Sequence, residues 1–166
     1  TGGASGIGKA CVLALNQRGV RVVIWDRQVG AGDGELQLSC DVSSAKDVEA
    51  ALEKTIAEVG VPRLCINCAG IAPAKRMVGK DGAMPLDVFK QVIDINLTAS
   101  FRLARAAIKG MLKRRSGRII FVTSVVGWTG NPGQANYCAS KGGLTAMAKS
   151  LAQEVASRGI TIRSEE

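Results

Sequence analysis

Two neighbouring stretches of the chain decide the fold: R-I-I-F-V-T-S-V-V-G at residues 118–127 and Y-C-A-S-K-G-G-L-T-A-M-A-K at residues 137–149. Ile119–Thr123 consists of β-branched or aromatic residues, which predicts a short strand buried on both faces. Glycines and a proline between residues 127 and 133 predict a loop without regular structure. From about Tyr137, apolar residues recur three and four apart and predict a helix: Leu144, Met147, Ala148 and Leu151.

Ser124, Tyr137 and Lys141 form a candidate proton-transfer site around this strand and helix. Residues four apart on a helix share one face, so the phenol and the ammonium lie about one turn apart. A free phenol has a pKa of about 10, too high for acid–base work at neutral pH, and a neighbouring cation favours the phenolate. By itself Tyr-x-x-x-Lys is also an ordinary pair on a helix surface, so the interpretation depends on the other motifs.

Length and composition predict one globular domain spanning residues 1–166. The chain is 46% hydrophobic and 22% charged, which is typical of a soluble domain with one core. No uncharged apolar run approaches the roughly 20 residues that span a bilayer, and no secretory leader is recognisable, so we expect a cytoplasmic protein. Histidine is absent, which excludes Ser-His-Asp and Cys-His catalysis and every His-ligated metal site. We predict no metal site.

Cysteine usage and charge each leave an alternative function to consider. Five cysteines are expected to be reduced thiols. Cys65 and Cys68 form a C-x-x-C motif within a strand-like run, where residues three apart face opposite sides, so we do not predict a redox pair. The net charge of +8 leaves a nucleic-acid-binding role open, but basic residues are scattered and aromatics few. A basic surface also suits an anionic cofactor, a CoA phosphate or an acidic carrier protein.

The first 26 residues contain a candidate dinucleotide-binding motif. T-G-G-A-S-G-I-G at residues 1–8 is followed by a helical pattern that ends near Gly19. Glycines allow close approach of a phosphate, and the helix N-terminus supplies N–H groups and partial positive charge. Residues 21–25 predict a strand ending at Asp26, which lies 18 residues beyond Gly8. At about this spacing a carboxylate binds the ribose hydroxyls of a dinucleotide.

The remaining chain continues the alternation of strands and helices. It predicts strands at 36–40 and 63–66, a helix at 45–59 capped by Ser43 or Ser44, and an irregular insert at 71–85. A long helix from about Leu86 to Arg115 and a strand beginning at Ile160 follow. Such alternation predicts an α/β fold, a Rossmann-like doubly wound parallel sheet with helices on both faces.

These motifs together resemble the short-chain dehydrogenase/reductase family over nearly the whole chain. Residues 1–8 match the family's TGxxxGxG, and residues 67–70, N-C-A-G, match its NNAG with cysteine in second place. Asn96, Ser124, Tyr137 and Lys141 match its catalytic tetrad. The second half is similar to bacterial 3-oxoacyl-[acyl-carrier-protein] reductases, whereas residues 67–75 look more like 3-hydroxyacyl-CoA or hydroxysteroid dehydrogenases. All of these interconvert a secondary alcohol and a ketone with NAD or NADP.

The resemblance implies a role for each matching residue. Ser124 would bind the substrate oxygen with Gln134 nearby, Tyr137 would transfer the proton, Lys141 would lower the pKa of the phenol and bind ribose, and Asn96 would hold a relay water. The residues implied in cofactor binding are Gly2, Ser5, Gly6, Ile7, Gly8, Asp26, Arg27, Asp41, Val42, Asn67, Ala69, Gly70, Tyr137 and Lys141. Asp26 favours NAD, because a 2′-phosphate would meet its carboxylate, although Arg27 leaves NADP possible.

The resemblance also implies partners and exposes departures. Family members form homodimers or homotetramers, and Arg115 and Arg158 match basic residues with which the bacterial reductases dock acyl carrier protein near the active-site mouth. The family's first strand, central in the sheet, and its C-terminal strand and substrate-closing segment are not found, so we interpret the chain as a fragment or an abbreviated variant. Residues 27–34 are short for a parallel crossover. A non-catalytic dinucleotide-binding or scaffolding protein therefore stays an alternative.

Overall fold

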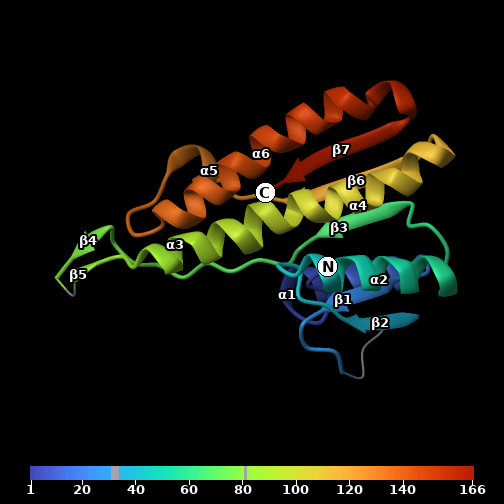
Figure 1. Ribbon diagram of the computed structural model, residues 1–166, viewed down its shortest axis with the longest axis horizontal. Helices are drawn as coiled ribbons and strands as arrows, with labels where there is room; N and C mark the ends of the chain where they lie inside the picture. Colours follow the sequence, from blue (N-terminus) through green and yellow to red (C-terminus); the bar gives the residue numbers. More distant parts are fainter. Residues whose placement is uncertain (31–33, 81) are drawn as a thin grey trace.

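A computed structural model describes residues 1–30, 34–80 and 82–166, so part of the expected short crossover at 27–34 lies outside the described residues. Strands and helices alternate along the chain (Figure 1). The strands are β1 (Val23–Asp26), β2 (Leu36–Ser39), β3 (Leu64–Asn67), β4 (Val78–Gly79), β5 (Gly82–Ala83), β6 (Gly117–Val122) and β7 (Ile160–Glu165). The helices are α1 (Gly6–Asn16), α2 (Ala45–Glu58), α3 (Leu86–Ile93), η1 (Asp94–Thr98), α4 (Ala99–Arg114), α5 (Val126–Thr129), α6 (Ala135–Val155) and η2 (Ala156–Arg158).

The long strands are all parallel, but they form two separate sheets. One sheet pairs β1 with β2, and the other has the order β3-β6-β7. The start of the chain lies between them: the Thr1 amino group donates to the Ile66 carbonyl at 2.7 Å, and the Gly2 N–H donates to the Trp25 carbonyl at 2.9 Å. Thr1 and Gly2 therefore join the carboxyl ends of β3 and β1.

Behind this junction a cavity of about 590 Å³ separates β1 from β3. Its walls include Val22–Trp25 and Leu64–Ile66 from the facing strand edges and Val12 and Leu15 from α1. This is the central position where the family resemblance puts a strand. The α/β parallel architecture expected from the sequence is confirmed, with the sheet divided at this position.

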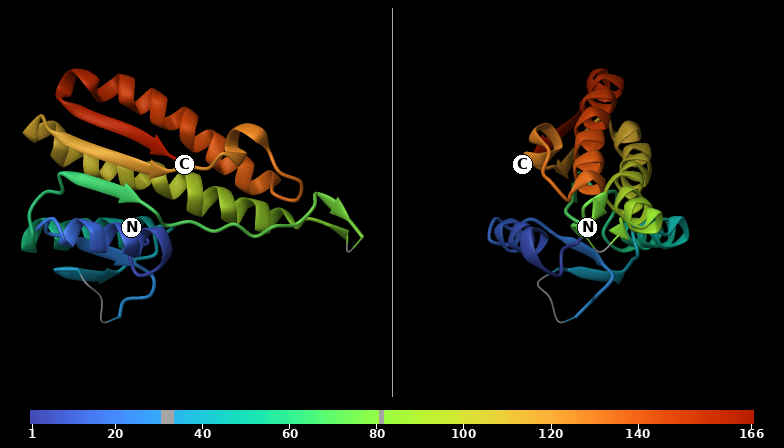
Figure 2. Two further views of the ribbon diagram at one scale, coloured as in Figure 1. Left: turned by 180° about the vertical axis from the view of Figure 1, so that it is seen from behind. Right: turned by 90° about the vertical axis from the view of Figure 1, so that its left-hand side faces the viewer.

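Two apolar cores lie on the same side of the sheets. Ile119, Phe121 and Ile160 of β6 and β7 pack against α4 and α6, and Trp25 and Leu38 of β1 and β2 pack against α2 and α4. Figure 2 shows α1 on the opposite side from α2, so helices lie on both faces.

The composition of residues 119–123 predicted a strand buried on both faces, but in the structure only one face of this strand is buried. Along β6 the buried residues are Ile119 and Phe121, whereas Arg118 is exposed and Ile120 is only half-buried. In the neighbouring strand Thr161 and Arg163 are also exposed. Among the described residues, one face of β6 and β7 is packed, and the polar side chains of β7 alternate on the other face.

Three local predictions need correction. The loop at 127–133 begins inside α5, where the Trp128 and Thr129 N–H groups donate to the Val125 carbonyl. The insert at 71–85 contains the β4–β5 hairpin, which projects from the body of the molecule (Figure 1). The long helix at 86–115 is continuous in space but passes through the π-helical turn η1, which contains Asn96.

Local sequence explains where the helices begin and end. Of the two predicted caps, Ser43 and Ser44, it is Ser44 that caps α2. Its side chain accepts a hydrogen bond from the Asp47 N–H. Helix α4 ends at Arg115 in the left-handed conformation, with φ of 53°. These boundaries bring the carboxyl ends of β1, β3 and β6 to one edge, where the candidate site residues follow each strand.

Candidate active site

The glycine-rich loop is packed against the N-C-A-G segment that follows β3. Gly2 has a φ of +68°, and a Cβ there would lie 2.6 Å from the Ala69 nitrogen. A Cβ on Gly8 would lie 2.0 Å from the Gly2 carbonyl oxygen. The Cys68 N–H also donates to the Thr1 carbonyl at 3.1 Å. Neither glycine tolerates a side chain without movement of the backbone, so the loop holds α1 close to the strand ends.

The exposed start of α1 meets the requirements of an anion-binding helix end. Ser5 is the N-cap residue and has an extended backbone, and the first turn of the helix contains no acidic residue. Ser5, Gly6 and Ile7 are all exposed, and Ile7 retains 62% of its accessible surface. Unpaired N–H groups at such a helix start attract phosphate.

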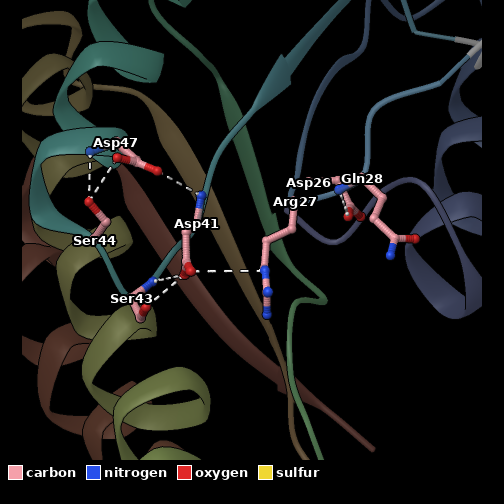
Figure 3. Close-up of polar contacts among 7 residues, drawn as sticks. All are labelled: Asp26, Arg27, Gln28, Asp41, Ser43, Ser44 and Asp47. Atoms are coloured by element: carbon pink, nitrogen blue, oxygen red, sulfur yellow. Dashed lines mark hydrogen bonds and ion pairs between the residues drawn. The ribbon is translucent and has the colours of Figure 1, made fainter.

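Asp26 lies beside the glycine-rich loop at the end of β1 (Figure 3). One carboxylate oxygen accepts the Ala4 N–H at 3.0 Å, and the other accepts the Gln28 N–H at 3.0 Å. These two bonds fix the carboxylate between the loop and the segment after β1. Its remaining lone pairs can accept hydrogen bonds from ribose hydroxyls.

Arg27 points away from Asp26 and toward the segment after β2 (Figure 3). Its guanidinium lies 3.9 Å from the Asp41 carboxylate, and the side chain is 71% exposed. Hydrogen bonds from the Ser43 hydroxyl and N–H lower the pKa of Asp41, and Arg27 lowers it further. The ion pair is solvent-screened, so Arg27 remains free to move.

Val42 is almost completely buried between β2 and α4, 6% exposed. Its carbonyl accepts a hydrogen bond from Arg102 of α4 at 2.8 Å. This bond joins residues 60 positions apart and fixes the segment that the family resemblance puts against adenine. Arg102 was not predicted from the sequence, because an arginine on a surface helix gives no indication of its partner.

Asn96 lies in η1 and is only 1% exposed. Its side chain forms two hydrogen bonds with the backbone of Ile71, each of 2.9 Å. Its amide also donates to the Ser140 hydroxyl at 3.1 Å. A Cβ on Gly70 would lie 3.1 Å from the Asn96 side-chain oxygen, so glycine permits this close approach.

Lys141 joins the end of β6 to the helix that carries Tyr137. Its ammonium donates to the Val122 carbonyl at 2.6 Å and lies 5.5 Å from the centroid of the Tyr137 ring. Burial lowers the pKa of Lys141, which is only 7% exposed. Ser124 follows Val122 by two residues, so the expected hydroxyl, phenol and ammonium come from neighbouring elements.

The site has a close packing contact that the sequence did not reveal. A Cβ on Gly127 of α5 would lie 2.9 Å from the Gly142 nitrogen of α6. Gly127 therefore allows α5, directly after Ser124, to rest against the backbone beside Lys141. Next to this turn lies an open cavity of about 520 Å³ lined by Met77, Pro132 and Cys138, among others.

Other predicted site residues have different surroundings. Gln134 is the N-cap residue of α6, and its side chain accepts a hydrogen bond from Asn131 at 2.7 Å. Asn67 is 4% exposed at the end of β3, and its amide nitrogen has no partner among the described residues. Such a buried unpaired donor is uncommon and is satisfied if a bound molecule or water reaches the strand end.

The prediction that Arg115 and Arg158 lie near the active-site mouth is wrong for this chain. Arg115 precedes β6, whereas Ser124 follows it. Arg158 precedes β7, whose first residue, Ile160, pairs with Gly117 at the start of β6. Because β6 and β7 are parallel, both arginines lie at the edge of the sheet opposite to Ser124.

The cysteines are all free thiols in the structure. Cys65 lies in β3 and Cys68 just beyond it, and burial raises the pKa of both thiols. A raised pKa opposes redox reactivity. Within the described ranges, no group of three or more acidic or cysteine side chains could hold a metal ion, and no helix is long and apolar enough to cross a membrane.

Comparison with known proteins identifies the family. The model of the short chain dehydrogenases matches residues 1–164. The chain belongs to the short-chain dehydrogenase family. It is therefore an oxidoreductase of the class that acts on alcohol and keto groups with a nicotinamide cofactor.

Curated relatives of this short-chain dehydrogenase share more than a third of its residues. The 3-oxoacyl-[acyl-carrier-protein] reductase of Vibrio cholerae is 38% identical over 99% of the chain and 69% of the relative. The enzyme of the same name from Escherichia coli K12 is 40% identical over 98% of the chain and 68% of the relative. Nodulation protein G of Rhizobium sp. N33 is 39% identical over 98% of the chain and 68% of the relative.

The residues of this short-chain dehydrogenase fit a nicotinamide dinucleotide. Gly6 is exposed at the start of α1, with nothing within 4 Å of a Cβ built there, and leaves room for a phosphate, whereas Gly2 and Gly8 pack the loop against neighbouring backbone. The start of α1 is exposed, and Asp26 holds a carboxylate next to it.

The buried polar side chains on α6 were not predicted from the sequence. Asn136, Ser140 and Thr145 interrupt the apolar pattern expected of a buried helix face, and this interruption could have indicated them.

Proposed function

We propose that this short-chain dehydrogenase interconverts a 3-oxoacyl thioester and its 3-hydroxy product. The observation that carries the proposal is the buried Lys141 ammonium, bound to the Val122 carbonyl at 2.6 Å and 5.5 Å from the Tyr137 ring centroid. An ammonium in this position stabilises negative charge on a phenol that has given up its proton. Bound nicotinamide would supply the hydride that completes the reduction.

Three side chains perform the proton transfer in this proposal. The Ser124 hydroxyl donates a hydrogen bond to the keto oxygen and holds it beside Tyr137. The Tyr137 O–H gives its proton to that oxygen during reduction and recovers one during oxidation. Lys141 favours the resulting phenolate. Asn96 fixes Ile71 and the start of the segment that follows N-C-A-G, which supports the wall of the site.

The cofactor residues act by binding and orienting. Gly2, Gly6 and Gly8 with Ser5 and Ile7 receive the pyrophosphate at the start of α1. Asp41 and Val42 flank the adenine, while Asn67, Ala69 and Gly70 line the path toward Ser124. These assignments are supported by the common edge on which the segments after β1, β2 and β3 lie.

Asp26 makes NAD the expected cofactor, with NADP as the alternative. Its carboxylate is fixed by the Ala4 and Gln28 N–H groups, whereas the Arg27 side chain is exposed and directed toward Asp41. A 2′-phosphate would bring about two negative charges against the fixed carboxylate, at a cost of several kcal/mol without a compensating cation.

Titration of NADH and NADPH binding tests this cofactor choice. The wild type should bind NADH more tightly, and Asp26→Ala should remove most of the preference. Arg27→Ala is the matched control and should change NADH binding little. Tighter NADPH binding by the wild type would show that Arg27 controls the choice. An unchanged ratio in Asp26→Ala would show that the carboxylate does not contact the ribose.

The substrate is proposed from the relatives and from the cavity beside α6. The relatives from Vibrio cholerae and Escherichia coli are named for action on 3-oxoacyl groups carried by acyl carrier protein. The open cavity of about 520 Å³ next to the turn bearing Tyr137 is lined by apolar groups of Met77 and Pro132, which suits an acyl chain. CoA thioesters, hydroxysteroids and small secondary alcohols are the alternative substrates.

Nicotinamide absorbance with NADH or NADPH and acetoacetyl-CoA tests the reaction. Carrier-bound 3-oxoacyl substrate, a steroid ketone and a small ketone are compared under the same conditions. Faster oxidation of the cofactor with the carrier-bound substrate is expected. Cofactor binding without turnover of any ketone would refute the catalytic proposal.

A dinucleotide-binding role without catalysis is the second candidate. This role would need only the glycine-rich loop and the Asp26 carboxylate, which accepts the Ala4 N–H at 3.0 Å. The nicotinamide assay separates the two candidates.

A homodimer or homotetramer is the expected assembly, in a cytoplasmic location consistent with the free thiols. Leu86 at the start of α3 is 65% exposed and Phe101 of α4 is 45% exposed. Pairing of the long helix from Leu86 and the helix that bears Tyr137 across a twofold axis would bury such apolar surface in a four-helix contact. Light scattering at micromolar concentration should give at least twice the 17.3 kDa of one chain, and a monomer would contradict the proposal.

A further inference from the structure

Segment 70–77, which follows N-C-A-G, is tied to helix α6 by buried polar side chains. Asn136 is completely buried, donates from its amide to the Pro73 carbonyl at 3.2 Å and accepts the Tyr137 N–H at 2.8 Å. The Lys75 N–H donates to the Gly133 carbonyl at 2.8 Å, just before α6 begins. The segment and the first turns of α6 therefore move as one unit.

Ser140 occupies the centre of this connection and is completely buried. Its hydroxyl accepts the Asn96 amide N–H at 3.1 Å and donates to the Tyr137 carbonyl at 2.7 Å. Asn96 in turn holds both backbone groups of Ile71. A continuous set of hydrogen bonds thus runs from Ile71 through Asn96 and Ser140 to the main chain of Tyr137.

A hydroxyl inside a helix commonly bonds a carbonyl of the preceding turn without further consequence. Thr145 is an example on the same helix, since its hydroxyl donates to the Lys141 carbonyl at 3.1 Å. Ser140 differs because its acceptor function is used by a side chain 44 residues away. Loss of the Ser140 hydroxyl would leave one N–H of the buried Asn96 amide without its partner.

We propose that Ser140 is a positioning residue that fixes the turn bearing Tyr137 and Lys141 relative to Asn96. The role rests on the proposed function, in which the phenol transfers the proton. Ser140 touches neither substrate nor cofactor in this proposal. It acts by holding the turn that bears both the phenol and the ammonium at a set distance from Ser124. Displacement of a reacting group by about 1 Å can reduce a rate by about a hundredfold, so a loosened turn has a measurable effect.

Tyr137 is the only tyrosine in the chain, which gives a readout that needs no activity. Ring NMR signals of protein made with isotope-labelled tyrosine report the surroundings of this side chain alone. Ser140→Ala should shift or broaden these signals relative to wild type, because the turn that bears the ring loses its connection to Asn96. Thr145→Val is the matched control: it removes a buried helical hydroxyl that donates to the Lys141 carbonyl instead and should leave the ring signals unchanged.

Hydrogen exchange and kinetics complete the test. Ser140→Ala should speed amide exchange at Ile71 and lower kcat about tenfold, with little change in KM or NADH affinity. Thr145→Val should match wild type in both measurements. Ser140→Cys has a similar volume and replaces the hydroxyl by a thiol, which is a weaker donor and acceptor, so it should give a kcat between those of wild type and Ser140→Ala. It also keeps the test possible if Ser140→Ala does not fold.

The outcomes separate this inference from the proposed function. A wild type without ketone reduction refutes the function, while the tyrosine ring signals and amide exchange still test the position of Tyr137. Equal behaviour of Ser140→Ala and Thr145→Val in ring signals, exchange and kcat, at similar melting temperatures, would overturn the positioning role. Equal activity of Ser140→Cys and Ser140→Ala, both far below wild type, would instead support a strict need for the oxygen atom and uphold the role.

Discussion

Replacement of Asn96 by aspartate should give a protein whose stability depends strongly on pH. The side chain is 1% exposed, and its amide donates to the Ile71 carbonyl at 2.9 Å and to Ser140 at 3.1 Å. Asn96→Asp keeps the shape and the oxygen that accepts the Ile71 N–H. It puts a second oxygen against the Ile71 carbonyl, and only a protonated carboxyl can donate there.

The size of the effect follows from burial. A carboxyl this deeply buried, facing a carbonyl oxygen, should have its pKa raised by about three units. Each unit corresponds to about 1.4 kcal/mol, so the ionised form should cost about 4 kcal/mol. Loss of the hydrogen bond from residue 96 to the Ser140 hydroxyl lowers the free energy of unfolding by about a further 1 kcal/mol at every pH. Because the folded pKa exceeds the unfolded value of about 3.9, stability is retained at low pH and lost as the pH rises through the folded pKa.

Urea unfolding of wild type, Asn96→Asp and Asn96→Ala between pH 5 and 8 measures this effect. The difference in the free energy of unfolding between wild type and Asn96→Asp should widen by about 2–3 kcal/mol from pH 5 to pH 7 and then become constant. Asn96→Ala should show a constant gap of about 2–3 kcal/mol, since it leaves buried groups unpaired without adding a charge. A gap for Asn96→Asp that does not change with pH would refute the buried hydrogen bonds to Ile71.

Three further changes test other parts of the site. Tyr137→Phe should abolish turnover and leave NADH affinity within about twofold, because only the proton donor is removed; more than a few per cent of the wild-type rate would exclude it as the acid. Gly8→Ala should abolish NADH binding, since its Cβ would lie 2.0 Å from the Gly2 carbonyl oxygen, whereas Gly30→Ala, with no neighbour within 4 Å, should bind normally; equal binding would show that the loop can relax. Burial raises the pKa of the Cys40 thiol to about 11, so iodoacetamide at pH 8 should modify it about a hundredfold more slowly in native protein than in urea; rapid native labelling would show that it is accessible.

Much of the fold and several site residues could be predicted from short stretches of sequence. Asp26 at the end of a strand, the turn at Gly2 and Gly8 and the helical spacing of Tyr137 and Lys141 depend on local backbone preferences, which act over a few residues. The alternation of strands and helices likewise predicts the parallel order, because parallel strands require crossovers. The family resemblance added roles for these positions.

Other features arise only from packing between distant parts of the chain. Asn96 and Ser140 are 44 residues apart, and Arg102 and Val42 are 60 apart, so no local pattern indicates that they meet. The exposed face of β6 and the far position of Arg115 follow from which strands become neighbours. The sequence by itself determined the loop, the strand ends and the Tyr137–Lys141 pair through local conformational preference. The tertiary structure alone decided the buried bonds to Ile71 and Val122, because long-range contacts depend on the packing of whole elements.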